Sequence, residues 1–216
     1  MTDRPARSRP SSADRPATTA APTQRRGPGS RAGHDHPTRL ELLDAAVDLA
    51  ERDGLRSLSI ADVTAAAGHA KGTFYVHFPD RAALLVALHQ WFHDKVFAQV
   101  IEQTADDAPG PARARRRVLA FLDACRTLPG VRALLLDART EPAIATEVEA
   151  RNRQATQALT ADLRGTTSHP GEVARILVLA TADIAGRESA QRRRLPPARQ
   201  ALLGLVLDPP PVMNPQ

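Results

Sequence analysis

The sequence has very little cysteine and no long apolar run, and both absences restrict where the protein can act. Cys125 is the single cysteine among 216 residues, so no disulfide can form within the chain and a reducing, cytoplasmic location is expected. No apolar stretch approaches the roughly 20 residues that span a bilayer. No hydrophobic segment typical of a signal peptide follows the basic N-terminus. We therefore expect a cytoplasmic protein without a membrane association.

Recognisable catalytic motifs are also missing. The sequence has no Gly-rich phosphate loop, no Cys and His spaced as zinc ligands, and no nucleophile elbow. Its acidic pairs, Asp106/Asp107 and Glu147/Glu149, lie one or two positions apart, so the two members do not share a helical face. We predict neither an enzyme nor a bound cofactor.

Aromatic residues make up only 3% of the chain, and six of the seven lie between positions 74 and 97. Hydrophobic residues nevertheless reach 42%, so most of the core must be built from Leu, Val, Ile and Ala. Their spacing follows the helical period throughout, and no segment shows the alternation of a strand. The predicted fold class is all-α.

The net charge of +5 is concentrated at the N-terminus. Residues 1–33 hold seven Arg and two Asp, whereas the rest of the chain carries equal numbers of basic and acidic residues. This first segment is rich in Pro, Arg, Ser and Thr and has no apolar period, so we expect it to be disordered. It is interpreted either as a basic arm that attracts DNA non-specifically or as an inert tail.

Residues 59–81 have the pattern of two short helices joined by a tight turn. Ser59 can cap the first helix, with Asp62 completing an acidic variant of the capping box. Gly68 stands where a helix end favours positive φ. The second helix, about residues 71–78, directs Phe74 and Phe78 to one face. Its other side is predicted to carry Lys71, Thr73, Tyr75 and His77, and the whole is a helix-turn-helix pattern.

Two further helices are predicted to flank this pattern. One covers about residues 38–52, with Thr38 and Glu41 as a capping box and a buried stripe formed by Leu40, Leu43, Val47 and Ala50. Asp80 is predicted to cap the other, which runs to about Thr104 and is long enough to leave a small domain and enter a second one. Later helices are expected at about 112–128, 131–138, 142–164, 171–190 and 197–207.

The helix-turn-helix residues resemble the tetracycline-repressor (TetR) family of bacterial transcription regulators. The resemblance covers about residues 38–85 and is carried by Ile60-Ala61-Asp62-Val63, Ala66-Ala67-Gly68, Lys71-Gly72-Thr73-Phe74-Tyr75-Val76-His77-Phe78, Arg81 and Leu84-Leu85. His69 and Ala70 depart from the family pattern, because a small apolar residue and a capping Ser or Thr are usual there. The resemblance implies a homodimer that binds a palindromic double-stranded DNA operator and releases it when a small-molecule effector binds.

The resemblance also implies a division of the chain. We expect a helix-turn-helix DNA-binding domain at 34–82, a helical ligand-binding and dimerisation domain at 83–208, and a tail at 209–216. Base edges would be read by Lys71, Thr73 and Val76, and Gly72 would allow close approach to the DNA. Phosphates would be bound by Thr38, Ser59, Tyr75, His77 and Arg81.

Two residue sets are predicted for the second domain. The effector pocket is expected near Trp91, Phe92, Phe121, Cys125 and Leu134, and a hydrophobic ligand is favoured. The dimer interface is expected on the last two helices, because nothing later in the chain could cover their apolar stripes. It would comprise Ile176, Leu177, Ala180, Ile184, Leu202, Leu203 and Val206.

Two alternatives remain open from the sequence. An α-helical adaptor could bind a protein and keep the helix-turn-helix as scaffold. A metal-sensing regulator could use His89 and His93, whose i, i+4 spacing can hold a metal ion.

Overall fold

The computed structural model describes residues 36–127 and 142–206, and every regular element within these ranges is helical. The all-α prediction is therefore confirmed. The expected N-terminal tail, the helix at about 131–138 with Leu134, and the tail at 209–216 lie outside the described residues. In chain order the described helices are α1 (Pro37–Asp53), η1 (Leu55–Ser57), α2 (Ile60–Ala66), α3 (Lys71–His77), α4 (Arg81–Gln103), α5 (Pro111–Thr127), η3 (Pro142–Ile144), α7 (Ala145–Leu163), α8 (Pro170–Gln191) and α9 (Pro196–Val206).

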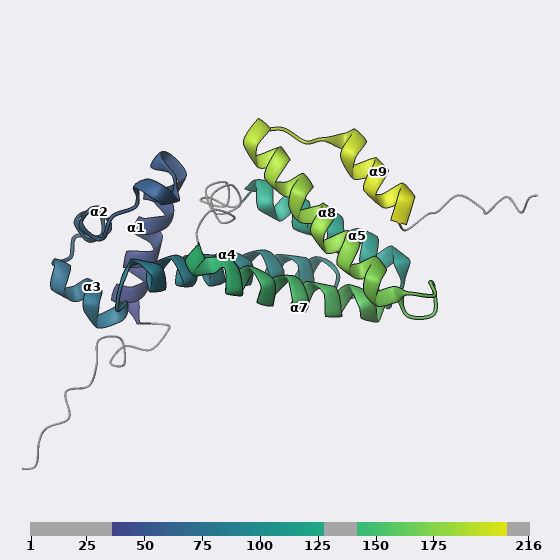
Figure 1. Cartoon of the computed structure of the whole chain (residues 1–216), viewed down its shortest axis with the longest axis horizontal. Coiled ribbons are helices and arrows are strands. Elements are labelled where there is room, and N and C mark those ends of the chain that lie inside the picture. The colour runs from purple at the N-terminus through teal and green to yellow at the C-terminus, as the bar shows by residue number, and fades with distance from the viewer. Residues whose placement is uncertain (1–35, 128–141, 207–216) are drawn as a thin grey trace, which may run out of the picture.

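Helices α1, α2 and α3 form a small three-helix unit at one end of the molecule (Figure 1). Its core is aliphatic and aromatic, and its fully buried members include Leu42, Val63 and Phe74. Two details of α1 differ from the sequence prediction. The N-cap is His36, whose Nδ1 accepts from the Thr38 amide at 3.2 Å, so Thr38 does not cap the helix. Leu40 is 39% exposed rather than buried, because it lies at the edge of the apolar stripe.

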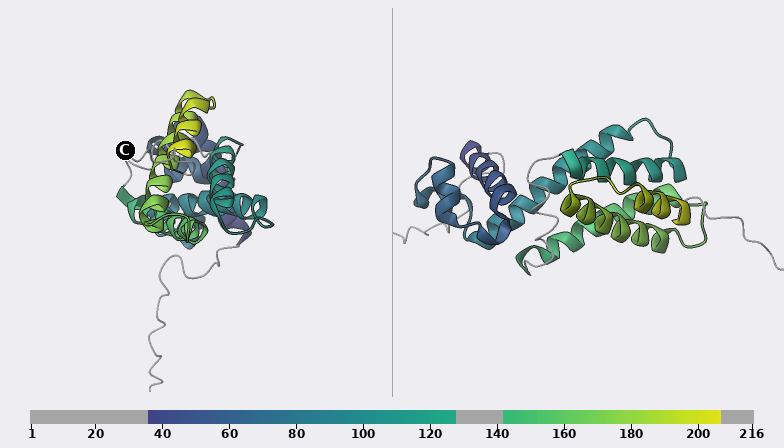
Figure 2. Two further views of the ribbon diagram at one scale, coloured as in Figure 1. Left: turned by 90° about the vertical axis from the view of Figure 1, so that its right-hand side faces the viewer. Right: turned by 90° about the horizontal axis from the view of Figure 1, so that it is seen from above.

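Helix α4 connects the two halves of the protein. Asp80 Oδ1 accepts from the Ala83 amide at 2.8 Å, which confirms the predicted cap. The 23-residue helix buries Leu84, Leu88 and Phe92 as it leaves the three-helix unit and continues alongside α5 and α7 (Figures 1 and 2). The fold is thus an N-terminal helix-turn-helix domain joined through α4 to a C-terminal helical domain.

The C-terminal domain is a bundle in which α8 packs against α5, α7 and α9. Two buried carboxylates hold it together. Asp162 of α7 is fully buried as a side chain and accepts from Arg113 and Arg117 of α5, the latter at 2.8 Å. Arg117 therefore takes part in the packing of α5 against α7. The helical period of α5 alone could not show that a carboxylate of α7 would lie opposite.

The second buried carboxylate is Glu188 of α8. Its Oε1 accepts from the Leu195 amide at 2.8 Å, and its Oε2 lies 2.6 Å from an Arg199 guanidinium nitrogen. Arg199 also donates to Asp123 Oδ1 of α5 at 2.8 Å. These bonds fix the start of α9 against both α8 and α5. Among the described residues, no helix is both long and apolar enough to cross a membrane.

Candidate DNA-binding face and ligand cavity

The helix-turn-helix is stabilised by a helix cap, a glycine turn and one contact with α1. Ser59 Oγ accepts from the Asp62 amide at 3.1 Å, as the capping pattern predicts. Gly68 has φ 71°, a left-handed conformation that favours glycine. His69 Nε2 lies 2.7 Å from Glu41 Oε2 of α1. This contact gives the unusual His69 a structural role, since it holds the turn against the first helix.

The outward side of α3 is the candidate reading face. Lys71 and Gly72 are exposed, Tyr75 is 37% exposed and Val76 42% exposed, whereas Thr73 is half-buried. The opposite side packs into the core, with Phe74 and Phe78 buried and their ring centroids 5.4 Å apart. Ala70 precedes the helix and makes no side-chain cap. The face therefore presents one cation, one phenol and one apolar side chain along a single short helix.

Two of the predicted phosphate ligands, His77 and Arg81, make contacts inside the protein. His77 is only 8% exposed, because it turns inward at the end of α3 and its ring centroid lies 4.9 Å from that of His36. Burial, followed by the nearby His36, Arg39 and His69, lowers the pKa of His77. The prediction that His77 belongs to the outward polar side is wrong. A neutral, buried imidazole is poorly suited to bind a phosphate.

Arg81 is an internal clamp rather than a side chain directed at solvent. Its Nε donates to the Leu58 carbonyl at 2.8 Å, and a terminal nitrogen donates to the Leu55 carbonyl at 2.5 Å. Arg81 is the first residue of α4. It therefore ties the start of the connecting helix to the backbone that leads into α2.

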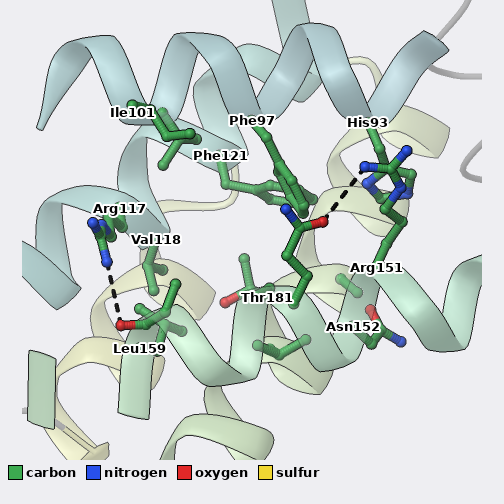
Figure 3. Close-up of a pocket in the computed structure, with 16 residues that line it drawn as sticks. His93, Phe97, Ile101, Arg117, Val118, Phe121, Arg151, Asn152, Leu159 and Thr181 are labelled. Atoms are coloured by element: carbon green, nitrogen blue, oxygen red, sulfur yellow. Dashed lines mark hydrogen bonds between the residues drawn. The ribbon is translucent and has the colours of Figure 1, made fainter. Parts of the chain in front are cut away.

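A cavity of about 250 Å³ lies in the C-terminal domain between α4, α5, α7 and α8 (Figure 3). Its walls are mainly aliphatic and aromatic. They are formed by His93, Phe97, Val100, Ile101, Arg117, Val118, Phe121, Arg151, Asn152, Gln154, Ala155, Ala158, Leu159, Val178, Thr181 and Ala182. A second, more polar hollow lies between α1, η1 and α2, beside Arg52 and Asp62.

Of the predicted pocket residues, Phe121 alone lines this cavity among those that the structure describes. Phe92 and Cys125 are buried core residues, and burial raises the pKa of the Cys125 thiol above its usual range. Trp91 is half-buried, with the Lys95 ammonium 5.9 Å from its ring centroid. Leu134 lies outside the described residues. The predicted set contains no residue of α7 or α8, although both line the cavity, because the period of one helix does not reveal which residues of another helix face it.

Ionic groups at both ends of the cavity are already paired. At one end, Arg151 donates to Glu147 Oε1 at 2.7 Å and contacts Asp94 Oδ1 of α4 at 2.8 Å. Gln90 of α4 donates to the other oxygen of Glu147 at 3.2 Å. These contacts join α4 to α7 next to the cavity. At the other end, beside the 63%-exposed Ile101, Arg117 is bound to Asp162.

His89 and His93 lie next to each other on α4 and are buried, with ring centroids 4.4 Å apart. No group of three or more His, Cys, Asp or Glu side chains within residues 36–127 and 142–206 could hold a metal ion. Burial lowers the pKa of His89 to about 4, and burial together with His89 and Arg151 lowers that of His93 to about 2. Both imidazoles are therefore neutral at physiological pH.

These histidines predict an acid-sensitive fold. The unfolded chain protonates His89 near pH 6.5, whereas the folded chain resists until about pH 4, so the free energy of unfolding falls as pH decreases across this window. Each such histidine contributes a slope of about 1.4 kcal/mol per pH unit. Chemical denaturation at several pH values should show this slope. His89→Met should reduce the slope by the contribution of one histidine, about 1.4 kcal/mol per pH unit. Leu88→Met, a core change without a titratable group, should leave the slope unchanged; equal slopes for wild type and His89→Met would contradict the assignment.

Four of the predicted dimer-interface residues are buried inside the single chain. Leu177 and Ile184 of α8 and Leu202 and Leu203 of α9 are between 0% and 7% exposed, because α8 packs against α5, α7 and α9. Ala180 is half-buried, and the side chain of Val206 lies outside the description. The outward face of α8 carries Ile176 at 52% and Leu179 at 49% exposure. The argument that nothing later in the chain covers the stripe left out the earlier helices α5 and α7, which pack against it, whereas the predicted Ile176 remains exposed beside Leu179.

A helix-turn-helix with an exposed reading face, joined by one long helix to a cavity-containing helical domain, defines a class of DNA-binding regulators. Residues 42–88 match the sequence profile of bacterial regulatory proteins of the tetR family. The match covers the helix-turn-helix and the start of α4, so this N-terminal part of the chain is a TetR-family DNA-binding domain.

One curated relative is the fatty acid metabolism regulator protein of Bacillus subtilis (strain 168), 28% identical over 82 residues that make up 38% of this chain. The match spans less than half the length of the curated relatives: 40% of the fatty acid metabolism regulator protein, and 28% of the uncharacterized HTH-type transcriptional regulator YuxN of the same strain.

Solved structures extend the similarity to the C-terminal domain. FadR from Bacillus subtilis in complex with stearoyl-CoA superposes with a TM-score of 0.64 at 13% identity, covering 79% of this chain and 98% of that one. AibR in complex with isovaleryl coenzyme A and operator DNA gives 0.61 at 19% identity, covering 80% and 98%. At these identities the likeness concerns the fold.

Proposed function

We propose that this protein is a homodimeric, ligand-responsive repressor that binds a palindromic operator and releases it when a small hydrophobic effector enters the cavity of the C-terminal domain. The observation that carries the proposal is the single helix α4, which begins at the reading domain and forms one wall of the cavity. The similar structures support ligand binding by a protein of this fold, since FadR was solved in complex with stearoyl-CoA and AibR in complex with isovaleryl coenzyme A and operator DNA.

The reading face would enter the major groove through α3. Lys71 can donate to guanine O6 and N7, and the methyl groups of Val76 can contact a thymine methyl. The hydroxyl of Tyr75 is suited to a phosphate, which positions the helix without reading sequence. Thr38 at the start of α1 and Ser59 at the start of α2 are additional phosphate candidates, and half-buried Thr73 can add a base contact. His77 and Arg81 are not included, because both are engaged within the protein.

Helix α4 would transmit the ligand signal because it is held firmly at two points. Arg81 binds its first turn to the carbonyls before α2, so the reading domain follows any tilt of the helix. Farther along, Gln90 and Asp94 bind it to Glu147 and Arg151 of α7, beside the cavity. A ligand that shifts α7 relative to α4 would change the separation of two reading helices in a dimer. DNA and effector must then oppose each other with the same coupling free energy.

The test is a gel shift with DNA from upstream of the protein's own coding region, using the full chain. We expect a retarded band that disappears when unlabelled DNA of the same sequence is added in excess and persists when unrelated DNA is added. Absence of specific retardation in every upstream fragment would contradict the proposal and favour the adaptor that binds protein.

Lys71 and Tyr75 should differ in what their loss does to DNA binding. Lys71→Ala is expected to weaken specific binding by about 1–3 kcal/mol and to relax the preference at one base pair. Tyr75→Phe should weaken binding to all sequences alike, since a phosphate contact carries no sequence information. Fluorescence anisotropy with the operator and single-base variants measures both effects. A changed base preference in Tyr75→Phe but not in Lys71→Ala would reverse the two roles.

Gly72 offers a test that separates stability from binding. Apart from its chain neighbours and the backbone of its own helix, a Cβ built at Gly72 meets no described atom within 4 Å, and the residue is exposed in helix α3. Gly72→Ala should therefore stabilise the folded protein by about 0.5–1 kcal/mol. If the space is needed by the DNA backbone, operator affinity should fall at the same time. Thermal unfolding and anisotropy give the two quantities, and an affinity that rises with stability would show that the DNA does not approach Gly72.

A further inference from the structure

The ligand cavity contains polar atoms that lack partners. Nδ1 of His93 and Oγ1 of Thr181 are buried without a hydrogen-bond partner in the described part of the chain, and both residues line the cavity. Their side chains come from α4 and α8, and they are 8% and 5% exposed. A buried polar group without a partner is destabilising, so such groups are rare in folded proteins unless a ligand or water completes them.

The two groups without partners stand among mainly apolar side chains. His93 contacts the aromatic ring of Phe97, with centroids 5.4 Å apart, and Phe97 in turn faces Phe121 at 6.5 Å. Figure 3 shows His93 at one end of the cavity near Arg151, and Ile101 with Arg117 at the other. The space between them can accept an apolar body, while His93 and Thr181 can each exchange one hydrogen bond with it.

Among the described residues that line this space, no unpaired cation lies next to His93. Next to His93, Arg151 is paired with Glu147 and Asp94, whereas Arg117, at the opposite end of the cavity, shares the fully buried carboxylate of Asp162 with Arg113. His93 is a neutral imidazole at physiological pH. A carboxylate or an ammonium placed against His93 would lose its hydration without gaining a counter-ion, and this loss is much more costly than the loss for a hydroxyl or a carbonyl.

We infer that the effector is an uncharged molecule with an apolar body and at least one hydrogen-bonding oxygen, and that His93 and Thr181 recognise that oxygen. The inference rests on the proposed ligand-responsive function and specifies the chemistry of the same cavity. His89, which packs against His93, holds the imidazole in position without lining the cavity itself.

The test is calorimetric titration of the full chain at pH 7.5 with four probes of equal chain length: 1-octanol, 2-octanone, octanoate and octylammonium. We expect the alcohol and the ketone to bind with a Kd at least about tenfold lower than that of either ion. His93→Phe, which keeps the ring but loses the nitrogen atoms, should weaken 1-octanol binding about three- to tenfold. Thr181→Val, which keeps the shape, should weaken binding of at least one neutral probe by a similar factor.

Two further variants serve as controls for the loss of hydrogen-bonding atoms and for the effect of a Thr→Val change in itself. His93→Gln retains hydrogen-bonding atoms and should bind 1-octanol more tightly than His93→Phe does. Thr160→Val makes the same chemical change on α7 outside the cavity lining, and it should leave all four Kd values unchanged. Should His93→Phe fail to fold, His93→Gln and Thr181→Val still decide the outcome.

Three results would overturn the inference. The first is tighter binding of octanoate than of 1-octanol, with the advantage lost in Arg117→Gln, which would place an anion at the Arg117 end. The second is equal affinity for 1-octanol in wild type, His93→Phe and Thr181→Val. The third is no binding of either neutral probe up to its solubility limit. Each is measured without DNA, so a negative titration with an intact gel shift would reject the ligand class and keep the regulator, whereas a failed gel shift would reject the regulator itself.

Discussion

Arg199→Ala is expected to destabilise the protein by about 3–5 kcal/mol, because it leaves a buried carboxylate without its counter-ion. Glu188 is 0% exposed and receives charge-assisted hydrogen bonds from Arg199 through both of its oxygens. The same guanidinium binds Asp123 of α5. The loss should appear in urea denaturation as a lower midpoint at nearly unchanged slope.

Arg194→Ala is the matched control for this substitution. Arg194 also contacts Asp123 Oδ1, at 3.0 Å, but its side chain is 60% exposed. An exposed ion pair contributes at most about 1 kcal/mol, so the control should lie close to the wild type. Equal losses in the two variants would show that burial of the Glu188 pair is not the cause.

The destabilisation should also depend on pH. Burial alone would raise the pKa of Glu188, but hydrogen bonds from Arg199 and the Leu195 amide, with the charge of Arg199, hold that pKa below its ordinary value. The contribution of the pair is therefore present above the pKa of Glu188 in the unfolded chain, about 4.3, and is lost as pH falls through the folded value. The difference between wild type and Arg199→Ala should shrink below about pH 4.

Leu179→Asp is expected to convert a dimer into a folded monomer and to abolish operator binding. Leu179 and Ile176 lie three positions apart on the outward face of α8, and each is about half exposed in the single chain. Large exposed apolar groups that share one face indicate an interface. A two-fold dimer through α8 would present two α3 helices to successive half-sites, about 34–36 Å apart or more, and a monomer would lose that paired contact.

Sedimentation velocity at micromolar concentration and anisotropy with the operator measure the two parts of this prediction. Ile101→Asp is the control, because Ile101 is also exposed but lies on α4 at one end of the cavity. It should remain dimeric and bind DNA. Leu203→Asp cannot serve the same purpose, since Leu203 is 4% exposed and its change would unfold α9. A wild type that sediments as a monomer would refute the proposed dimer and the palindrome together.

The reading domain could be predicted closely from the sequence because its signals are local. Ser59 and Asp62 form a cap within four consecutive residues, and Gly68 marks a turn by its own conformational freedom. Phe74 and Phe78 face inward because they are one helical turn apart. The period of α4 likewise predicted a helix long enough to join two domains.

Only the tertiary structure decided which apolar faces are covered and which charges are paired. The pattern of α8 predicts an apolar stripe, but α5, α7 and α9 bury Leu177 and leave Ile176 exposed one position away. The partners of Asp162 and Arg199 are up to 76 positions distant along the chain. Helical periodicity specifies the direction of a side chain relative to its own axis. The neighbour that it meets depends on how the helices pack, which is why the cavity and the buried ion pairs could not be predicted residue by residue.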